Sequence, residues 1–217
     1  MPHTLIFFIM FIFIKNSHYN HMEFEADLIR FFQLNMSPAW VIVFRVISMF
    51  GSLMGFAITF FIVFLKKRSL AYALFVSYFV FQLLNRVLKH LIARNRPFVD
   101  YQDIVNYDNE DGFSFPSGHS LSAGIFASYI VYVIIKSNSQ SLNKALSIVL
   151  VSIISFSVLV SRMALGAHYL TDTIVGLILG ILFAIISILV YNIIMKKLFF
   201  KRDYIGENNG RNIVGGD

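Results

Sequence analysis

The sequence predicts an all-α membrane protein, a polytopic bundle of about six transmembrane helices with one interfacial amphipathic helix. Of its 217 residues, 57% are hydrophobic and only 14% are charged, whereas a soluble domain carries about 25% charged residues. Apolar runs follow one another almost to the end of the chain, as expected for successive membrane spans. We therefore expect one membrane-embedded domain over residues 1–205. A Gly- and Asn-rich tail over residues 206–217 is expected to be disordered.

The net charge of +6 does not by itself indicate a nucleic-acid partner. The basic residues flank apolar runs, so membrane topology and phosphate binding explain them better. The chain has no cysteine, which excludes disulfides, thiol catalysis and thiolate metal sites. The expected partner is therefore the lipid bilayer, with no nucleic acid.

The first apolar run, residues 5–14, is short for a span, which needs about 20 residues. We expect a short, uncleaved helix, because a basic n-region and a small-x-small cleavage site are both lacking. A signal-peptide core and a misassigned start codon are the alternatives.

Residues 22–35 have a different pattern, because apolar side chains from Phe24 to Phe32 recur at helical spacing between charged residues. This pattern is typical of an amphipathic helix that lies in the membrane interface. A helix packed on the bundle is the alternative that the sequence leaves open.

Five longer apolar runs supply the remaining spans. Ser37 and Pro38 are typical of a helix cap followed by a first-turn proline, and they precede the first run. In the last run, Gly176 and Gly180 form a small-xxx-small pair that can let another helix approach closely. The five predicted spans cover residues 39–65, 70–88, 117–135, 145–160 and 171–195.

Basic residues in the short connections predict the orientation of the bundle. One side, which should be the cytoplasm, also receives the C-terminus. Residues 89–117 and 161–172 then fall on the outer face. The basic stretch 86–96 departs there from the positive-inside rule, which indicates an anionic ligand; a topology exception with solvated charges is the alternative. The cytoplasmic clusters are Lys66–Arg68, Lys136 with Lys144, and Lys196–Arg202.

An Arg, a His and an Asp lie within residues 161–172, between two strongly apolar runs. Charged groups at membrane depth are costly, and they indicate a functional site. His168 and Asp172 are four residues apart, so on a helix they share one face. The carboxylate can then hold the imidazole in one tautomer and make it a nucleophile or a base. Arg162 offers a planar fork for phosphate oxygens.

Two further stretches contain groups suited to an anion. Lys89 and Arg96 share a face if their helix persists, although Pro97 favours a position for Arg96 just past the helix end. Two cations at a bilayer edge suit a phosphate, but snorkelling side chains are also ordinary at helix ends.

The other stretch, Pro116-Ser117-Gly118-His119, opens a predicted span. Free N–H groups at a helix N-terminus bind anions, and Gly118 allows close approach. Ser117 can cap the helix or donate a hydrogen bond, and His119 can act as an acid. Taken alone, this stretch is equally consistent with a simple helix start.

In order, the three stretches read Lys-x6-Arg-Pro, Pro-Ser-Gly-His and Ser-Arg-x5-His-x3-Asp. They resemble the signature of the type 2 phosphatidic acid phosphatase superfamily. The resemblance is to its membrane lipid phosphatases, which include bacterial phosphatidylglycerophosphatase B and undecaprenyl pyrophosphate phosphatases. The motifs lie within residues 89–172, and the surrounding runs agree with a six-span bundle. Only the short first run departs from the pattern.

The resemblance implies a role for each motif residue. His168 would attack phosphorus and form a phosphohistidine, and Asp172 would orient and polarise it. His119 would protonate the leaving oxygen and then activate water. No metal or other cofactor is expected, because cations and N–H donors around the equatorial oxygens can stabilise a phosphoryl-transfer transition state. The residues implied to hold the phosphoryl oxygens are Lys89, Arg96, Ser117, Gly118 and Arg162.

The expected function is therefore metal-independent dephosphorylation of a membrane lipid at the outer face of the cell membrane. Undecaprenyl pyrophosphate, phosphatidylglycerol phosphate and phosphatidic acid are the candidate substrates. Vanadium-dependent haloperoxidases share these motifs, but they are soluble proteins. A non-catalytic lipid-phosphate transporter or sensor is the other alternative, although it would need the cations and not both His119 and His168.

Overall fold

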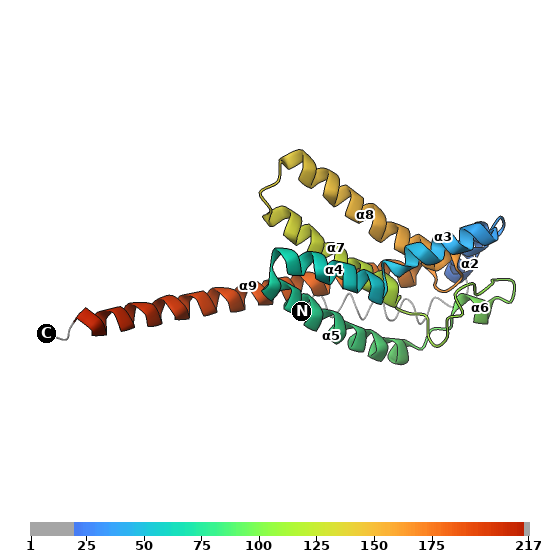
Figure 1. Ribbon diagram of the computed structural model, residues 1–217. Coiled ribbons are helices and arrows are strands. Elements are labelled where there is room, and N and C mark those ends of the chain that lie inside the picture. The colour runs from blue at the N-terminus through green and yellow to red at the C-terminus, as the bar shows by residue number, and fades with distance from the viewer. Residues whose placement is uncertain (1–19, 215–217) are drawn as a thin grey trace.

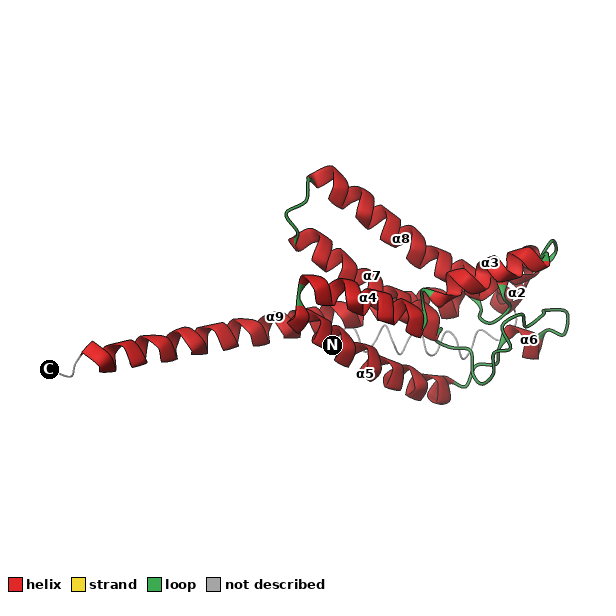
Figure 2. Cartoon of the chain, in the orientation of Figure 1, coloured by secondary structure: helices red, strands yellow, loops and turns green. Residues whose placement is uncertain are grey.

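The computed structural model describes residues 20–214, and every regular element in that range is a helix (Figures 1 and 2). The prediction of an all-α membrane bundle is confirmed. The predicted first helix, residues 5–14, lies outside the described residues. The elements are α2 (Asn20–Gln33), α3 (Pro38–Met49), α4 (Leu53–Lys66), α5 (Arg68–Ile92), α6 (Pro97–Asp100), α7 (Gly118–Lys136), α8 (Ser141–Ala164) and α9 (Leu170–Val214).

Four helical segments in the described part of the chain are long and apolar enough to cross a membrane. The helices α2 and α3 meet at a bend of 119°, and they make a fifth span only if the pair is taken as one. Helix α4 is apolar but has only 14 residues. The four long segments are Arg68–Asp100, Gly118–Lys136, Ser141–Ala164 and Leu170–Leu198.

The prediction of one continuous span over residues 39–65 is wrong, because α3 ends at Met49 and α4 begins at Leu53. Ser52 caps α4, its hydroxyl accepting a hydrogen bond from the Met54 amide at 3.3 Å. Gly51 packs against the first turn of α7, where a β-carbon would lie 2.5 Å from the carbonyl oxygen of His119. The missing side chain lets the α3–α4 junction lie directly on α7.

Helix α2 has one buried face and one exposed face. Ala26 and Ile29 are fully buried in a cluster with residues from α8 and the loop after α6. Phe24 and Phe31 are 65% and 69% exposed. The helix is therefore packed on the bundle, as the alternative interpretation held, and its outer face carries the aromatic side chains that suit a membrane interface.

Helix α7 packs against α4, α5, α8 and α9, and its most extensive pairing is with α9. The two helices approach closely at the glycines of α9, as predicted. A β-carbon at Gly176 would lie 2.6 Å from the carbonyl oxygen of Ser117, and one at Gly180 would collide with the backbone of Leu121. The first turn of α9 is thereby held against the N-terminus of α7, which brings the second and third motifs together.

The two ends of the bundle differ (Figure 1). One end carries the α4–α5 and α7–α8 connections with their lysines, and α9 projects beyond it. The other end carries α6, the loop of residues 101–117 and the turn of residues 165–169. All three motifs therefore meet at the end opposite the basic connections.

Helix α9 continues through Val214, so residues 206–214 are helical where the composition predicted disorder. The backbone hydrogen bonds of a helix are local, and adding residues to an existing helix costs much less than starting one. A long preceding helix can therefore extend through a sequence whose composition disfavours packing.

Candidate active site

The first motif straddles a helix end. Helix α5 stops at Ile92, and Ala93 follows in the left-handed conformation with φ of 51°. Arg96 is extended and precedes α6, which confirms that Pro97 places it past the helix end. Lys89 remains on α5 and donates to the carbonyl oxygens of Phe113 at 2.6 Å and Ser114 at 3.2 Å. The two cations thus approach the loop before α7 from different directions.

The second motif forms the start of α7, as predicted. Ser117 is fully buried and caps the helix, its hydroxyl accepting from the Ser120 amide at 3.4 Å. Its own amide donates to the carbonyl oxygen of Asp172 at 3.0 Å. Gly118 and His119 follow in the first turn and line a cavity. This backbone link fixes the start of α7 relative to the third motif.

The third motif is not continuously helical, so the prediction that His168 and Asp172 share a helix face is wrong. Helix α9 begins at Leu170, and His168 precedes it in a tight turn. Gly166 makes that turn with φ of 74°, and a β-carbon there would collide with the carbonyl oxygen of Val105. Side chains across this turn therefore meet through its tertiary packing rather than through helical spacing.

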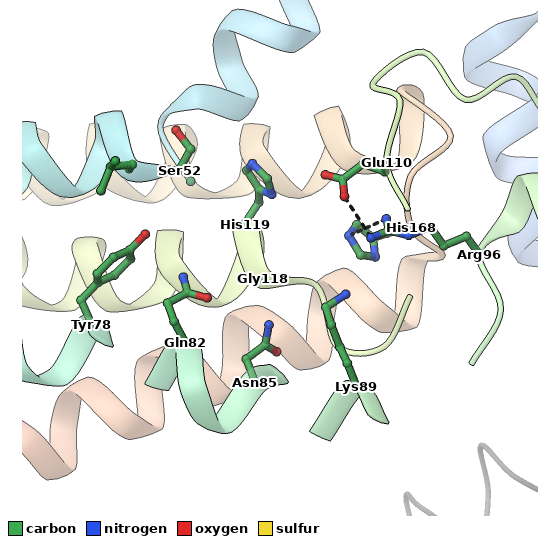
Figure 3. A pocket seen from close by; sticks show the side chains of 12 residues that line it. Ser52, Tyr78, Gln82, Asn85, Lys89, Arg96, Glu110, Gly118, His119 and His168 are labelled. Carbon is green, nitrogen blue, oxygen red and sulfur yellow. Dashed lines mark hydrogen bonds and ion pairs between the residues drawn. The ribbon is translucent and has the colours of Figure 1, made fainter. Parts of the chain in front are cut away.

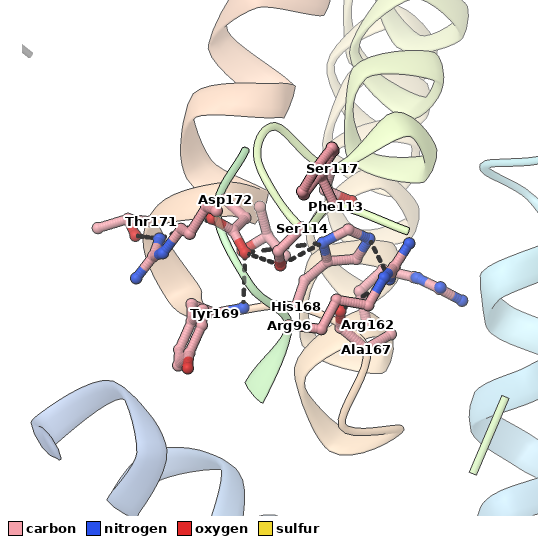
Figure 4. A network of polar contacts seen from close by, with 12 residues as sticks. Arg96, Phe113, Ser114, Ser117, Arg162, Ala167, His168, Tyr169, Thr171 and Asp172 are labelled. Carbon is pink, nitrogen blue, oxygen red and sulfur yellow. Dashed lines mark hydrogen bonds and ion pairs between the residues drawn. The ribbon is translucent and has the colours of Figure 1, made fainter. Parts of the chain in front are cut away.

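Ser114 lies between His168 and Asp172 (Figure 4). The imidazole Nδ1 is 3.7 Å from Asp172 Oδ2, which exceeds a direct hydrogen bond, but it is 3.3 Å from Ser114 Oγ. The Ser114 hydroxyl donates to Asp172 Oδ2. Because the single proton of this hydroxyl points to Asp172, Ser114 Oγ can only accept a hydrogen bond from His168. The proton of the neutral imidazole therefore lies on Nδ1, and Nε2 keeps its lone pair. Sequence analysis missed Ser114.

The imidazole of His168 is 2% exposed. Burial holds the pKa of His168 well below its usual value, and the nearby Asp172 carboxylate only partly opposes this effect. The ring is consequently neutral near pH 7, which is the form that a nucleophile needs.

A second missed residue, Arg94, supports Asp172 from behind. Its guanidinium donates to Asp172 Oδ1 at 2.6 Å and to Thr171 Oγ1 at 2.7 Å. It also pairs with Glu25 of α2 at 2.8 Å and lies 4.1 Å from the centre of the Tyr169 ring. The amphipathic helix α2 is thereby tied to the carboxylate of Asp172.

The acidic loop supplies the third unexpected contact. Glu110 accepts from Arg96 at 2.9 Å with one oxygen and from Arg162 with the other. Arg162, which is fully buried, also pairs with Asp108 and donates to Ser48 Oγ at 2.8 Å. A carboxylate thus lies between two arginines that the sequence assigned to phosphate. In the sequence, an acidic loop between two basic motifs was the signal that could have predicted this pairing.

Several residues of the three motifs, together with Glu110, border a cavity of about 340 Å³ (Figure 3). Arg96 and His168 lie at one end, His119 and Gly118 in the middle, and Gln82 and Tyr78 at the other end. Ser117, Arg162 and Asp172 are not among the residues that line it. The full lining comprises Gly51, Ser52, Leu53, Tyr78, Gln82, Asn85, Lys89, Arg96, Glu110, Gly118, His119 and His168.

All eight predicted site residues therefore gather at one end of the bundle. Among the described side chains, those of residues 23–198, no group of three or more from His, Asp or Glu has the arrangement of a metal site. The acidic side chains nearest His168 are instead paired with arginines.

Fold and site together define a helical membrane protein with a cationic, histidine-containing cavity at one end. The family model of the PAP2 superfamily matches residues 67–196, more than half of the chain, and this protein belongs to that superfamily.

Among curated proteins, phosphatidylglycerophosphatase B of Bacillus subtilis is 39% identical over 102 residues, which is 46% of this chain and 48% of the relative. A lipid A 1-phosphatase of Rhizobium etli is 30% identical over 168 residues, which is 70% of this chain and 66% of the relative. The matched region thus spans about half the length of the first relative.

Two solved structures resemble this chain in their fold. One is a transmembrane PAP2-type phosphatidylglycerolphosphate phosphatase from Bacillus subtilis, with a TM-score of 0.70 and 27% identity over 86% of this chain and 94% of that chain. The other is LpxE of Aquifex aeolicus, with a TM-score of 0.61 and 22% identity over 75% of this chain and 93% of that one. The second likeness concerns the fold alone.

Proposed function

We propose that this protein is a lipid phosphatase that hydrolyses a membrane lipid phosphate or pyrophosphate through a phosphohistidine, without a metal ion. The observation that carries the proposal is the environment of His168. Its Nδ1 contacts the hydroxyl of Ser114, which in turn donates to Asp172, and its ring borders a cavity lined by cations. The relatives named as lipid phosphatases support the same reaction class.

In the first step, the Nε2 lone pair of His168 forms a bond to phosphorus while the bond from phosphorus to the leaving oxygen breaks. His119 gives its proton to that oxygen, so the leaving group departs neutral. The imidazole becomes cationic on phosphorylation, and the Asp172 carboxylate behind it stabilises that charge.

In the second step, a water molecule attacks the phosphohistidine, and His119 accepts the proton that the water loses. The bond from phosphorus to Nε2 breaks, which releases inorganic phosphate and restores the neutral imidazole. Charge on the equatorial oxygens is stabilised by Lys89, Arg96 and Arg162, together with N–H groups at the start of α7.

The guanidinium groups of Arg96 and Arg162 are already bridged by Glu110, so a phosphoryl group competes with this carboxylate for the same donors. Arg162 Nε has no acceptor within residues 20–214 and is a further donor for phosphoryl oxygens. We infer that the loop carboxylate moves aside when the substrate binds.

We place the protein in the cell membrane with this site on the extracytoplasmic side and the C-terminus in the cytoplasm. The basic connections at the opposite end of the bundle support this orientation through the positive-inside rule. The candidate substrates are undecaprenyl pyrophosphate, phosphatidylglycerol phosphate and phosphatidic acid.

The test is phosphate release from these three lipids by the purified protein in detergent with EDTA, beside His168→Ala. We expect release from at least one lipid by the wild type and none by the variant. Acid-labile labelling of His168 by a substrate with a radioactive phosphate would identify the intermediate. Lipid binding by both proteins without any release would support a sensor instead, and release by the variant would mean that His168 is not the nucleophile.

A further inference from the structure

The mechanism leaves one buried polar group on the cavity wall unexplained. Asn85 lies on α5 one turn before Lys89, lines the cavity and is only 4% exposed. Among the side chains that the structure describes, those of residues 23–198, its Oδ1 has no hydrogen-bond partner. A buried amide without partners destabilises the folded protein, so its presence at a binding cavity points to a ligand that completes its hydrogen bonds.

The position of Asn85 along the cavity identifies the part of the substrate that it meets. In phosphoryl transfer, the attacking and leaving atoms lie roughly in line on opposite sides of phosphorus. His168 lies at one end of the cavity, and His119, which protonates the leaving oxygen, lies farther along it (Figure 3). The leaving oxygen must then lie near His119, where Asn85 forms the facing wall of the cavity and Gln82 lies farther from His168 (Figure 3).

The chemistry of Asn85 restricts what that leaving group carries. The unpaired atom is an acceptor, so it needs a donor; ionised phosphate and ester oxygens only accept, whereas a hydroxyl can donate. The neighbouring amide of Gln82 does not supply one: its Nε2 donates to Ser122 Oγ at 2.7 Å, and Asn85 Oδ1 has no partner among the described side chains.

We propose that Asn85 is a specificity-determining residue that hydrogen-bonds a hydroxyl on the leaving group. The preferred substrates are then lipid phosphates whose phosphate is carried on a hydroxylated headgroup, such as a glycerol or a sugar. This inference rests on the proposed phosphatase function and narrows its substrate class.

A pair of lipids that differ by one hydroxyl tests the proposal directly. One is phosphatidylglycerol phosphate, and the other is its 1,3-propanediol analogue, which lacks only the free hydroxyl of the headgroup. We expect the wild type to hydrolyse the glycerol lipid with a kcat/KM about 10-fold higher, as one lost hydrogen bond predicts. A lipid-linked sugar 1-phosphate in the same assay shows which hydroxylated headgroup is turned over faster.

Two variants assign the discrimination to Asn85. In Asn85→Leu, which keeps the branching at Cγ, and in Asn85→Ala, the ratio of kcat/KM for the two lipids should fall to about 1. Asn85→Leu should also raise the melting temperature in detergent, because it removes an unpaired buried amide. The matched control is Asn143→Leu on the exposed first turn of α8, which should keep the wild-type ratio.

Each failure has its own signature. No release from any lipid by the wild type would refute the proposed function, which is a different outcome from a failure of this inference. Release with equal kcat/KM for the two lipids, or a ratio that survives in folded Asn85→Leu, would overturn the role of Asn85. The comparison of the two lipids with the wild-type protein needs no variant, so it tests the preference for a hydroxylated headgroup even where a variant misfolds.

Discussion

Two arginine–carboxylate networks flank His168, and they are built for different tasks. The rear network, Arg94 with Asp172 and Glu25, lies against α2 and the first turn of α9, away from the cavity lining. The front network, Arg96 and Arg162 with Glu110 and Asp108, reaches that lining through Arg96 and Glu110. Both neutralise buried charge, but only the front carboxylate lies where a substrate anion can replace it.

The difference shows that the same ion pair can serve structure or binding according to what can compete for it. A buried charge that loses its partner is strongly destabilising. At the rear no ligand can take the place of a lost carboxylate, whereas in the proposed mechanism the phosphoryl group does so at the front. Substitutions in the rear should therefore affect stability and turnover together, and substitutions in the front should mainly affect binding.

The largest expected effect is that of Asp172→Asn in the rear network. The amide cannot stabilise the imidazolium that forms on phosphorylation, so kcat should fall by about 10³–10⁴-fold. Steady-state phosphate release against wild type measures this. A decrease below about 10-fold would mean that Ser114 alone positions His168.

Arg94→Met should come next, because it leaves Asp172 and Glu25 without their shared cation. We expect a loss of about 3–5 kcal/mol in stability, seen as a lower melting temperature in detergent, and a fall in kcat of about 100-fold. The matched control is Arg45→Met, whose side chain is half exposed. Unchanged melting for both variants would contradict the structural role assigned to the rear network.

The charge state of His168, which lies between the two networks, can be measured directly. An unperturbed histidine with a pKa near 6.5 is about 97% protonated at pH 5, whereas burial lowers the pKa of His168. Its ring signals in ¹⁵N NMR, assigned with His168→Ala, should therefore stay those of the neutral imidazole from pH 7.5 down to pH 5. Full protonation near pH 6.5 would mean that the ring is accessible to water.

The same shift has a consequence for stability. The unfolded chain binds a proton at His168 near pH 6.5 and the folded protein does not, so this group lowers the stability of the fold as the pH falls below 6.5. The lost stability should be smaller in folded His168→Ala, measured as the difference in melting temperature between pH 7.5 and pH 5.

The smallest expected effect is that of Glu110→Gln in the front network. Removing the negative charge frees Arg96 and Arg162 for an external anion, so inorganic phosphate should inhibit about 3–10-fold more strongly. Competitive inhibition measured at constant ionic strength checks this, with Asp103→Asn in the same loop as control, since that carboxylate pairs with Arg30 instead. Weaker inhibition in Glu110→Gln would show that Glu110 organises the anion site rather than competing for it.

The sequence by itself determined the membrane bundle and the three motifs of the candidate site. Long apolar runs reveal spans because the bilayer imposes its thickness on each helix. Charged residues among those runs reveal the site because membrane depth makes them costly. Pro97 even indicated the helix break before Arg96, since its ring restricts the preceding residue. These signals are local, and they can be read from neighbours in the chain.

Only the tertiary structure decided which groups complete the site. Ser114 lies 54 residues from His168, and Arg94 lies 69 residues from Glu25; no local pattern joins such pairs. The break at Gly51 follows from its contact with α7, and the unpaired amide of Asn85 becomes visible only once its surroundings are known. Hydrogen bonding and burial depend on what folding brings together, whereas hydropathy and backbone restriction belong to each residue.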